Sequence, residues 1–149
     1  MSMDDFDPEV KIRDLYAECL SFQRPKERLL GTETTFQNSR FRSDMRTIDS
    51  EDIVREWEFK ICAGYGALGQ ILTYVALSRC LASNGKTVIR GVLAAFDFEP
   101  EIVLANEQLN LGIEFLSLPR WMRRAGGVPE QLSLSVPLVQ IPKLQRQSI

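Results

Sequence analysis

Two acids and a lysine alternate with aromatic residues in the stretch Glu56-Trp57-Glu58-Phe59-Lys60. Successive side chains of a β-strand point to opposite faces, so the carboxylates and the ammonium would share one face and the rings the other. Charged groups on one face of an otherwise apolar strand are costly to bury unless something binds them. A divalent cation would do so, because oxygen ligands suit Mg²⁺ or Mn²⁺, and Lys60 would then stand beside a metal-bound water.

A further acid and a polar helix face accompany this stretch. Asp44 lies in the preceding strand candidate, where two adjacent strands would bring it beside Glu58. Downstream, Gln70 and Tyr74 have i, i+4 spacing and therefore share one face near the start of a predicted helix. The stretch Glu9-Val10-Lys11 also has an acid two residues before a lysine, but it falls in the first turn of a predicted helix. It is interpreted as solvated charge.

The elements that position these residues follow from hydrophobic periodicity. Three short strands with polar connections predict an antiparallel meander, and the strand–helix–strand order after it predicts a right-handed parallel crossover. The result is an α/β fold, a mixed sheet with helices on both faces. Helices are expected over residues 8–22, 68–82 and 100–110, and strands over 32–37, 40–48, 53–62, 88–96 and 113–118.

Composition narrows the possible chemistry. The 149 residues are 44% hydrophobic with a net charge of -2, as expected for one globular domain and without an overall charge that favours nucleic acid. Because the chain has no histidine, a Ser-His-Asp relay and a His-ligated zinc site are excluded. Residues 1–5 are acidic where a signal peptide would be basic, and no apolar run approaches the ~18 residues that span a membrane. A cytoplasmic protein without membrane contact is expected.

The order Asp44, Glu58-Phe59-Lys60, Gln70-x-x-x-Tyr74 resembles the PD-(D/E)xK nuclease superfamily, and specifically its RecB-like branch. The resemblance covers about residues 8–118, and a single nuclease-like domain is expected over residues 1–118. It implies a restriction-endonuclease-like αβββαβ core. It also implies a metal-dependent nuclease that hydrolyses DNA phosphodiester bonds with Mg²⁺ or Mn²⁺, and structure- or end-selective cleavage is favoured over site-specific restriction.

The resemblance also implies a ligand set. Asp44 and Glu58 would be metal ligands, and the carbonyl of Phe59 a third. An acid from the first helix sometimes joins the metal shell in such enzymes, and Glu18 is the candidate here. The proline that precedes the family's aspartate is Ser43 in this chain.

The remaining catalytic roles are carried over in the same way. Lys60 would orient or activate the attacking water, and Gln70 and Tyr74 would steady the active site and the substrate strand. Glu56 competes with Glu58 for the role of acid, but only Glu58 has the family's two-residue offset to Lys60.

Basic residues suggest where a nucleic acid would lie. Arg40, Arg42 and Arg46 fall on one predicted strand face with Asp44, where they would either balance its charge or meet phosphates as substrate-binding residues. Residues 119–149 carry five basic residues against one acid and are expected to form an edge hairpin or a basic tail.

The small size of the domain favours a homodimer or a partner protein that supplies specificity. The alternative function is a catalytically inactive nuclease-fold protein that acts as an interaction or assembly module. The net acidity of the chain favours that alternative.

Overall fold

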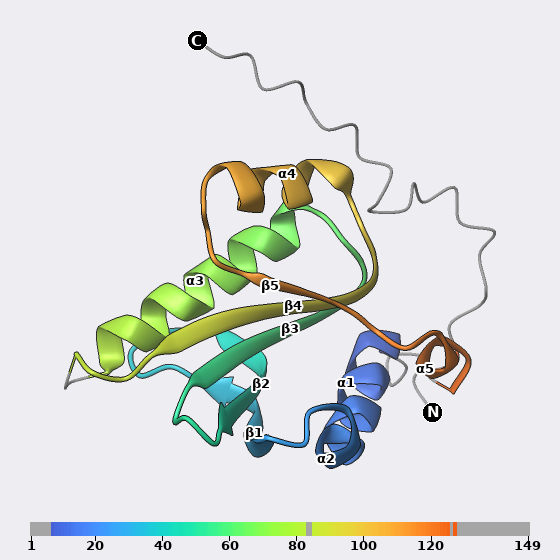
Figure 1. The fold of residues 1–149 in the computed structure, drawn as a ribbon, viewed down its shortest axis with the longest axis horizontal. Coiled ribbons are helices and arrows are strands. Elements are labelled where there is room, and N and C mark those ends of the chain that lie inside the picture. The colour runs from blue at the N-terminus through green and yellow to red at the C-terminus, as the bar shows by residue number, and fades with distance from the viewer. Residues whose placement is uncertain (1–6, 83–84, 126, 128–149) are drawn as a thin grey trace, which may run out of the picture.

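The three predicted antiparallel strands form one half of a single mixed sheet. The computed structural model describes residues 7–82, 85–125 and 127, and in it the sheet has the strand order β1-β2-β3-β4-β5 (Figure 1). β1, β2 and β3 pair antiparallel, whereas β4 lies parallel to β3 and β5 parallel to β4. The elements are α1 (Pro8–Glu18), α2 (Leu20–Gln23), β1 (Glu27–Thr35), β2 (Arg42–Asp49), β3 (Val54–Ala63), α3 (Tyr65–Leu81), β4 (Ile89–Phe98), α4 (Pro100–Gln108), β5 (Glu114–Ser117) and α5 (Arg120–Ala125).

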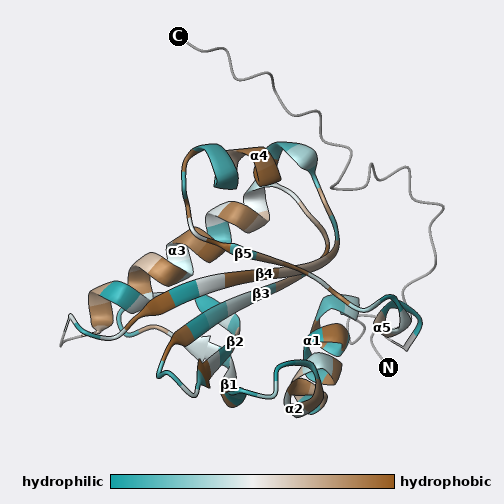
Figure 2. Ribbon diagram, viewed as in Figure 1, coloured by the Kyte–Doolittle hydropathy of each residue, from teal (hydrophilic) through white to brown (hydrophobic). Residues whose placement is uncertain are grey.

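Two apolar clusters, one on each face of the sheet, pack the helices against the strands (Figure 2). On one face Trp57 and Phe59 of β3 pack against Tyr16 of α1, with ring centroids 5.5 and 5.7 Å from the tyrosine ring. On the other face α3 and α4 cover β4. α3 approaches β4 closely at Gly91, where a Cβ atom would lie 2.8 Å from the side chain of Val75. The predicted separation of the two faces of β3 is therefore confirmed.

The N-terminal elements differ from the expectation in two ways. The predicted helix over residues 8–22 is divided at Cys19 into α1 and α2. The first strand begins at Glu27 rather than at residue 32, because residues 27–29 pair with the end of β2 before a register shift at Leu30. This strand lies at the sheet edge and is largely exposed, so its first half lacks the alternation from which a strand is predicted.

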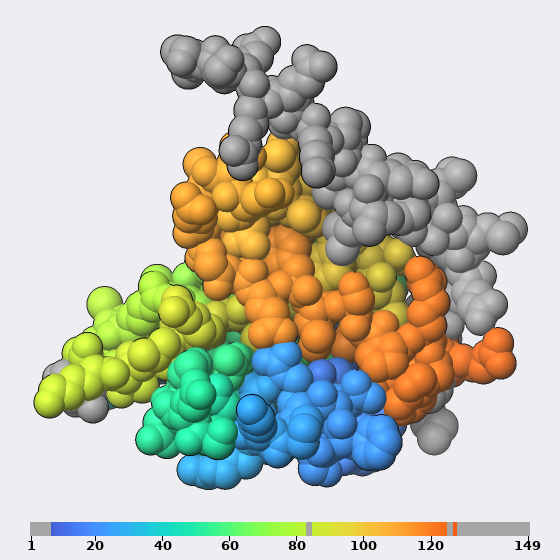
Figure 3. Space-filling model, viewed as in Figure 1, coloured from blue at the N-terminus to red at the C-terminus, as the bar shows by residue number. Residues whose placement is uncertain are grey.

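The predicted C-terminal extension begins with α5, which packs beside α1 (Figures 1 and 3). Met122 of α5 is fully buried in the cluster that contains Trp57. This extension was predicted over residues 119–149 as an edge hairpin or a basic tail. Residues 120–125 form a helix instead, and residues 128–149 lie outside the described part of the chain. Within the described part, no helix is both long and apolar enough to cross a membrane.

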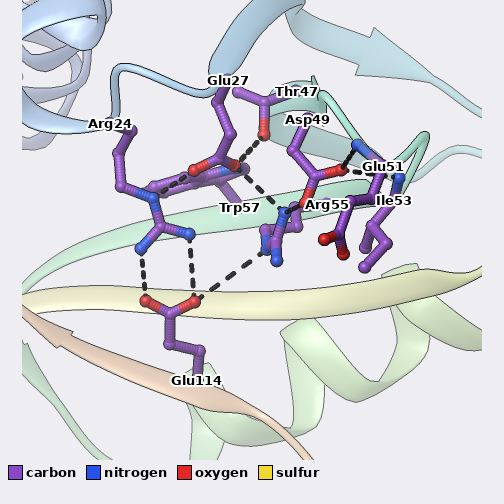
Figure 4. A network of polar contacts seen from close by, with 9 residues as sticks. All are labelled: Arg24, Glu27, Thr47, Asp49, Glu51, Ile53, Arg55, Trp57 and Glu114. Carbon is purple, nitrogen blue, oxygen red and sulfur yellow. Dashed lines mark hydrogen bonds and ion pairs between the residues drawn. The ribbon is translucent and has the colours of Figure 1, made fainter.

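An ion-pair network ties β1, β3 and β5 together near the start of β3 (Figure 4). Arg24 contacts Glu27 and also lies 2.5 Å from Glu114 of β5. Arg55 of β3 lies 2.7 Å from Asp49 and within 3.6 Å of Glu27. Each arginine therefore has two or more carboxylate partners within the fold. We define these five residues as the Arg24–Arg55 network.

Candidate active site

The strands β2 and β3 separate at the point where the predicted site residues begin. Their backbone ladder ends at the pair Met45 and Trp57, so Asp44 and Glu58 follow directly beyond the last pair. Beyond that pair, the Asp44 side chain replaces the backbone of β2 as the partner of β3, because its Oδ2 accepts a hydrogen bond of 2.7 Å from the backbone N–H of Phe59. The predicted neighbourhood of Asp44 and Glu58 is thus produced by a split in the sheet.

A second carboxylate occupies the same free edge of β3. Glu9 Oε2 accepts a hydrogen bond of 3.0 Å from the backbone N–H of Ile61, and Glu9 Oε1 lies 3.9 Å from Lys60 Nζ. Backbone N–H groups two residues apart point to the same side of a strand, so this hydrogen bond repeats the one between Asp44 and Phe59.

The assignment of Glu9 to solvated charge was therefore wrong. Its place on β3 depends on where α1 begins, which is set by Pro8 in the first turn and by the Asp7 cap, whose Oδ1 accepts from the Glu9 N–H at 2.9 Å. Glu18, which the resemblance suggested, lies exposed at the far end of α1 and does not line the pocket described next. Glu9 is the acid that the first helix contributes.

These residues surround a small pocket of about 150 Å³ at the split between β2 and β3. Inside it Lys60 Nζ lies 3.6 Å from Glu58 Oε1. The N–H and the carbonyl of one residue point to the same side of a strand, so the Phe59 carbonyl also faces this edge. The lining residues are Asp7, Glu9, Val10, Arg13, Asp44, Glu58, Phe59 and Lys60.

Glu58 is the unsatisfied acid of this pocket. It is buried, and its Oε2 has no hydrogen-bond partner among the described residues. Burial, and next the charge of Asp44, raise the pKa of Glu58 to about 8 although Lys60 opposes the shift. Burial likewise raises the pKa of Asp44, against the Phe59 N–H and the charges of Arg13 and Lys60. The pKa values of these two neighbouring acids are raised because burial and mutual repulsion disfavour two negative charges, so a shared proton or a bound cation would each relieve the pair.

Glu56 lies two residues earlier on the same face and behaves in the opposite way. It is fully buried, and Arg46 Nε lies 2.5 Å from its Oε1. Ser78 Oγ donates to the same oxygen at 3.1 Å, and Ser43 Oγ donates to Oε2 at 2.7 Å. Both oxygens of Glu56 have partners, so this acid is structural and leaves Glu58 as the acid of the pocket.

The raised pKa of Glu58 should make the stability of the protein depend on pH. A carboxyl group whose pKa rises on folding, here from 4.5 to about 8, stabilises the fold below pH 4.5 and loses that contribution as the pH rises to 8. Between pH 5 and 8 in EDTA, the melting midpoint of the wild type should fall by about 5 °C more than that of Glu58→Gln, which has no carboxyl to ionise. Calorimetric melts across this range test the difference, and parallel curves for the two proteins would contradict it.

The two predicted residues of α3 have different surroundings. Tyr74 is buried and stacks on Phe36 with ring centroids 5.9 Å apart. Burial, and then the charges of Glu58 and Asp44, raise the pKa of its hydroxyl, which therefore lies close to the acids. Gln70 is exposed one turn earlier, and its side chain forms no hydrogen bond within the described residues.

The three arginines that were predicted to bind substrate also have different surroundings. Arg46 Nε is paired with Glu56 and its guanidinium lies 5.3 Å from the centre of the Phe36 ring, so Arg46 balances a buried charge. Of the two roles left open for this residue, charge balance is the one observed, but with Glu56 rather than Asp44. Arg40 and Arg42 are exposed at the beginning of β2.

An antiparallel meander, two parallel crossovers and an acid–lysine pocket at the split between β2 and β3 define a restriction-endonuclease-like α/β fold. No family model and no curated protein matches the sequence. Among solved structures, the chain is similar to a repair endonuclease from Pyrococcus abyssi, with a TM-score of 0.62 and 19% identity over 78% of this chain and 49% of that one.

Two structures of EndoMS are similar as well. One is a complex with dsDNA, with a TM-score of 0.60 and 20% identity over 74% of this chain and 45% of that one. The other is the apo form, with a TM-score of 0.58 and 21% identity over 79% of this chain and 48% of that one. The chain thus spans about half the length of each of these proteins. The similarity confirms the predicted fold, whereas the RecB-like branch stays a prediction.

Proposed function

We propose that this protein is a metal-dependent nuclease that hydrolyses DNA phosphodiester bonds. The observation that carries the proposal is Glu58, a buried acid with an unpartnered oxygen and a raised pKa, set beside Asp44 and Lys60 in one pocket. The similar solved structures support the choice of substrate, since they are named as a repair endonuclease and as EndoMS, once in complex with dsDNA.

The donor set of the pocket fits Mg²⁺ or Mn²⁺. Asp44, Glu58 and the Phe59 carbonyl would hold the cation, and Glu9 is the acid of α1 nearest to them. Within the described residues no three acidic, histidine or cysteine side chains already converge as a metal cage. The proposed site therefore relies on the two carboxylates and one carbonyl named above, and Mg²⁺ is usually held by one or two carboxylates together with waters and substrate phosphates. The bound cation would supply charge neutralisation at the phosphoryl oxygens and a water of lowered pKa.

Lys60 is the residue of the chain that would act on the attacking water. Its ammonium lies between Glu58 and Glu9, 3.6 and 3.9 Å from their nearest oxygens, and is partly exposed in the pocket. From there it would orient a water toward the phosphorus and offset the charge that develops on the phosphoryl group. Asp44 would keep the free edge of β3 in place through its hydrogen bond to Phe59.

The choice of DNA structure would come from outside this small pocket. We propose that a homodimer or a partner protein supplies it, and that ends, flaps or junctions are favoured over a fixed sequence. Arg40 and Arg42, exposed at the start of β2, remain as candidate contacts to phosphates beside the site.

The function is tested with purified protein on labelled single-stranded, duplex and branched DNA. Cleavage should appear with Mn²⁺ or Mg²⁺, should stop with EDTA, and should be strongest on one of the structured substrates. If none of the substrates is cut with either metal, the catalytically inactive interaction module becomes the better interpretation. Cleavage that persists in EDTA would contradict the metal-dependent mechanism.

A further inference from the structure

We propose that Arg13 is a contact for a substrate phosphate, a role that rests on the proposed function and extends it to a residue outside the acid–lysine motif. Arg13 lies on α1 one turn after Glu9, so both side chains point to the same side of the helix. It is only 6% exposed, and it lines the pocket together with Asp44 and Lys60. Its charge reaches Asp44, whose pKa it lowers against the effect of burial.

Arg13 is paired with two carboxylates that a ligand in the pocket could replace. Asp14 Oδ1 accepts from its Nε and NH2 at 3.0 and 2.8 Å, and Glu33 Oε1 lies 3.7 Å from NH1. Both carboxylates are 54% exposed, whereas the Arg13 side chain is only 7% exposed. A buried guanidinium has to keep an anionic partner. A phosphate in the pocket would supply one, and the displaced carboxylates would recover their hydration.

The charges of the pocket suit a cation first and a phosphate only beside it. Four carboxylates line the pocket, against the two cations Arg13 and Lys60. A phosphodiester that enters with the proposed cation adds a negative charge and needs a donor that the cation-binding acids do not occupy. The planar guanidinium of Arg13 matches two phosphate oxygens at once, whereas the ammonium of Lys60 acts as a point charge.

The Arg24–Arg55 network provides a half-buried arginine, Arg24, for comparison. Arg24 also contacts two carboxylates, but its partner Glu27 is itself nearly fully buried and none of the network's residues lines the pocket. A role that is merely structural would make Arg13 behave like Arg24. If Arg13 contacts a phosphate, its replacement should change DNA binding and the salt slope, whereas replacement of Arg24 should not change the salt slope.

The test measures binding of fluorescent single-stranded and duplex oligonucleotides to the wild-type protein in EDTA, where no cleavage is expected. Arg13→Gln should weaken binding about tenfold and Arg13→Lys less, because a lysine keeps the charge but loses the paired donors of the guanidinium. Arg13→Gln should also lower the slope of log K against log salt by about 0.7 to 0.9, the value of one lost phosphate contact. Asp14→Asn, which frees the guanidinium, should tighten binding about threefold.

Arg24→Gln is the matched control and should lower the melting midpoint without changing the salt slope. Unchanged affinity and slope in Arg13→Gln, with DNA still bound by the wild-type protein, would overturn the role of Arg13 and leave the proposed function intact. Weaker binding in Asp14→Asn would also overturn it, because the ion pair would then be structural. If the wild-type protein binds neither oligonucleotide, the role of Arg13 is overturned, whereas the proposed function is judged separately by the cleavage assay with Mn²⁺ or Mg²⁺.

Discussion

Replacing Lys60 with alanine, or Glu58 with glutamine, should reduce DNA cleavage by about a thousandfold or more in a protein that remains folded. Glu58→Gln removes the pocket's unpartnered carboxylate, on which cation binding depends, while the volume of the side chain is kept. Lys60→Ala removes the ammonium beside that acid. Both changes delete charge from a pocket and leave the apolar clusters intact. Single-turnover cleavage assays with Mn²⁺ give the rates, and circular dichroism confirms the fold.

Glu56→Gln is the matched control, since it makes the same chemical change two residues away on the same face of β3. Glu56 is fully enclosed by Arg46, Ser43 and Ser78, so its loss should lower stability and leave the cleavage rate per folded molecule within a few-fold of the wild type. Equal cleavage by wild type, Lys60→Ala and Glu58→Gln would indicate a contaminating nuclease. A rate loss in Glu56→Gln as large as that in Glu58→Gln would contradict the assignment of the two acids.

Arg46→Met should destabilise the protein by about 3 kcal/mol, because it leaves the fully buried charge of Glu56 without its cation. The methionine preserves most of the apolar contact that Arg46 makes over the Phe36 ring, so the loss reports mainly on the charge. Urea denaturation at pH 7 measures the free energy of unfolding.

Two further variants complete this prediction. Arg42→Met changes an exposed arginine of the same strand and should alter stability by less than about 0.5 kcal/mol. The double variant Arg46→Met/Glu56→Leu removes both charges and should recover much of the loss. If Arg46→Met is as stable as Arg42→Met, then Arg46 does not balance Glu56.

The strong local patterns predicted the parts of the fold that carry the site. The alternation over residues 53–62 and the continuous apolar run over 88–96 correspond to β3 and β4, whose side chains divide between the two faces as expected. Strand alternation also put Glu58 and Lys60 on one face, and pairing of neighbouring strands put Asp44 beside them.

Contacts between distant segments could not be predicted in the same way. Glu9 follows a helix cap, where acids are common for local reasons, and nothing near it in the sequence specifies that it meets the Ile61 N–H. The i, i+4 spacing of Glu9 and Arg13 was the available signal, because Ile12 and Tyr16 show which side of α1 is buried. The arginines of β2 have similar sequence surroundings, so their roles depended on knowing which of them faces Glu56.

The central claim is that Asp44 and Glu58 share a divalent cation, and anomalous diffraction from crystals grown with Mn²⁺ tests it most directly. We expect one manganese peak about 2.0 to 2.3 Å from oxygens of both carboxylates in the wild type. In crystals of Glu58→Gln this peak should be lost or greatly weakened. A pocket without manganese in the wild type, or a peak bound away from both acids, would contradict the claim.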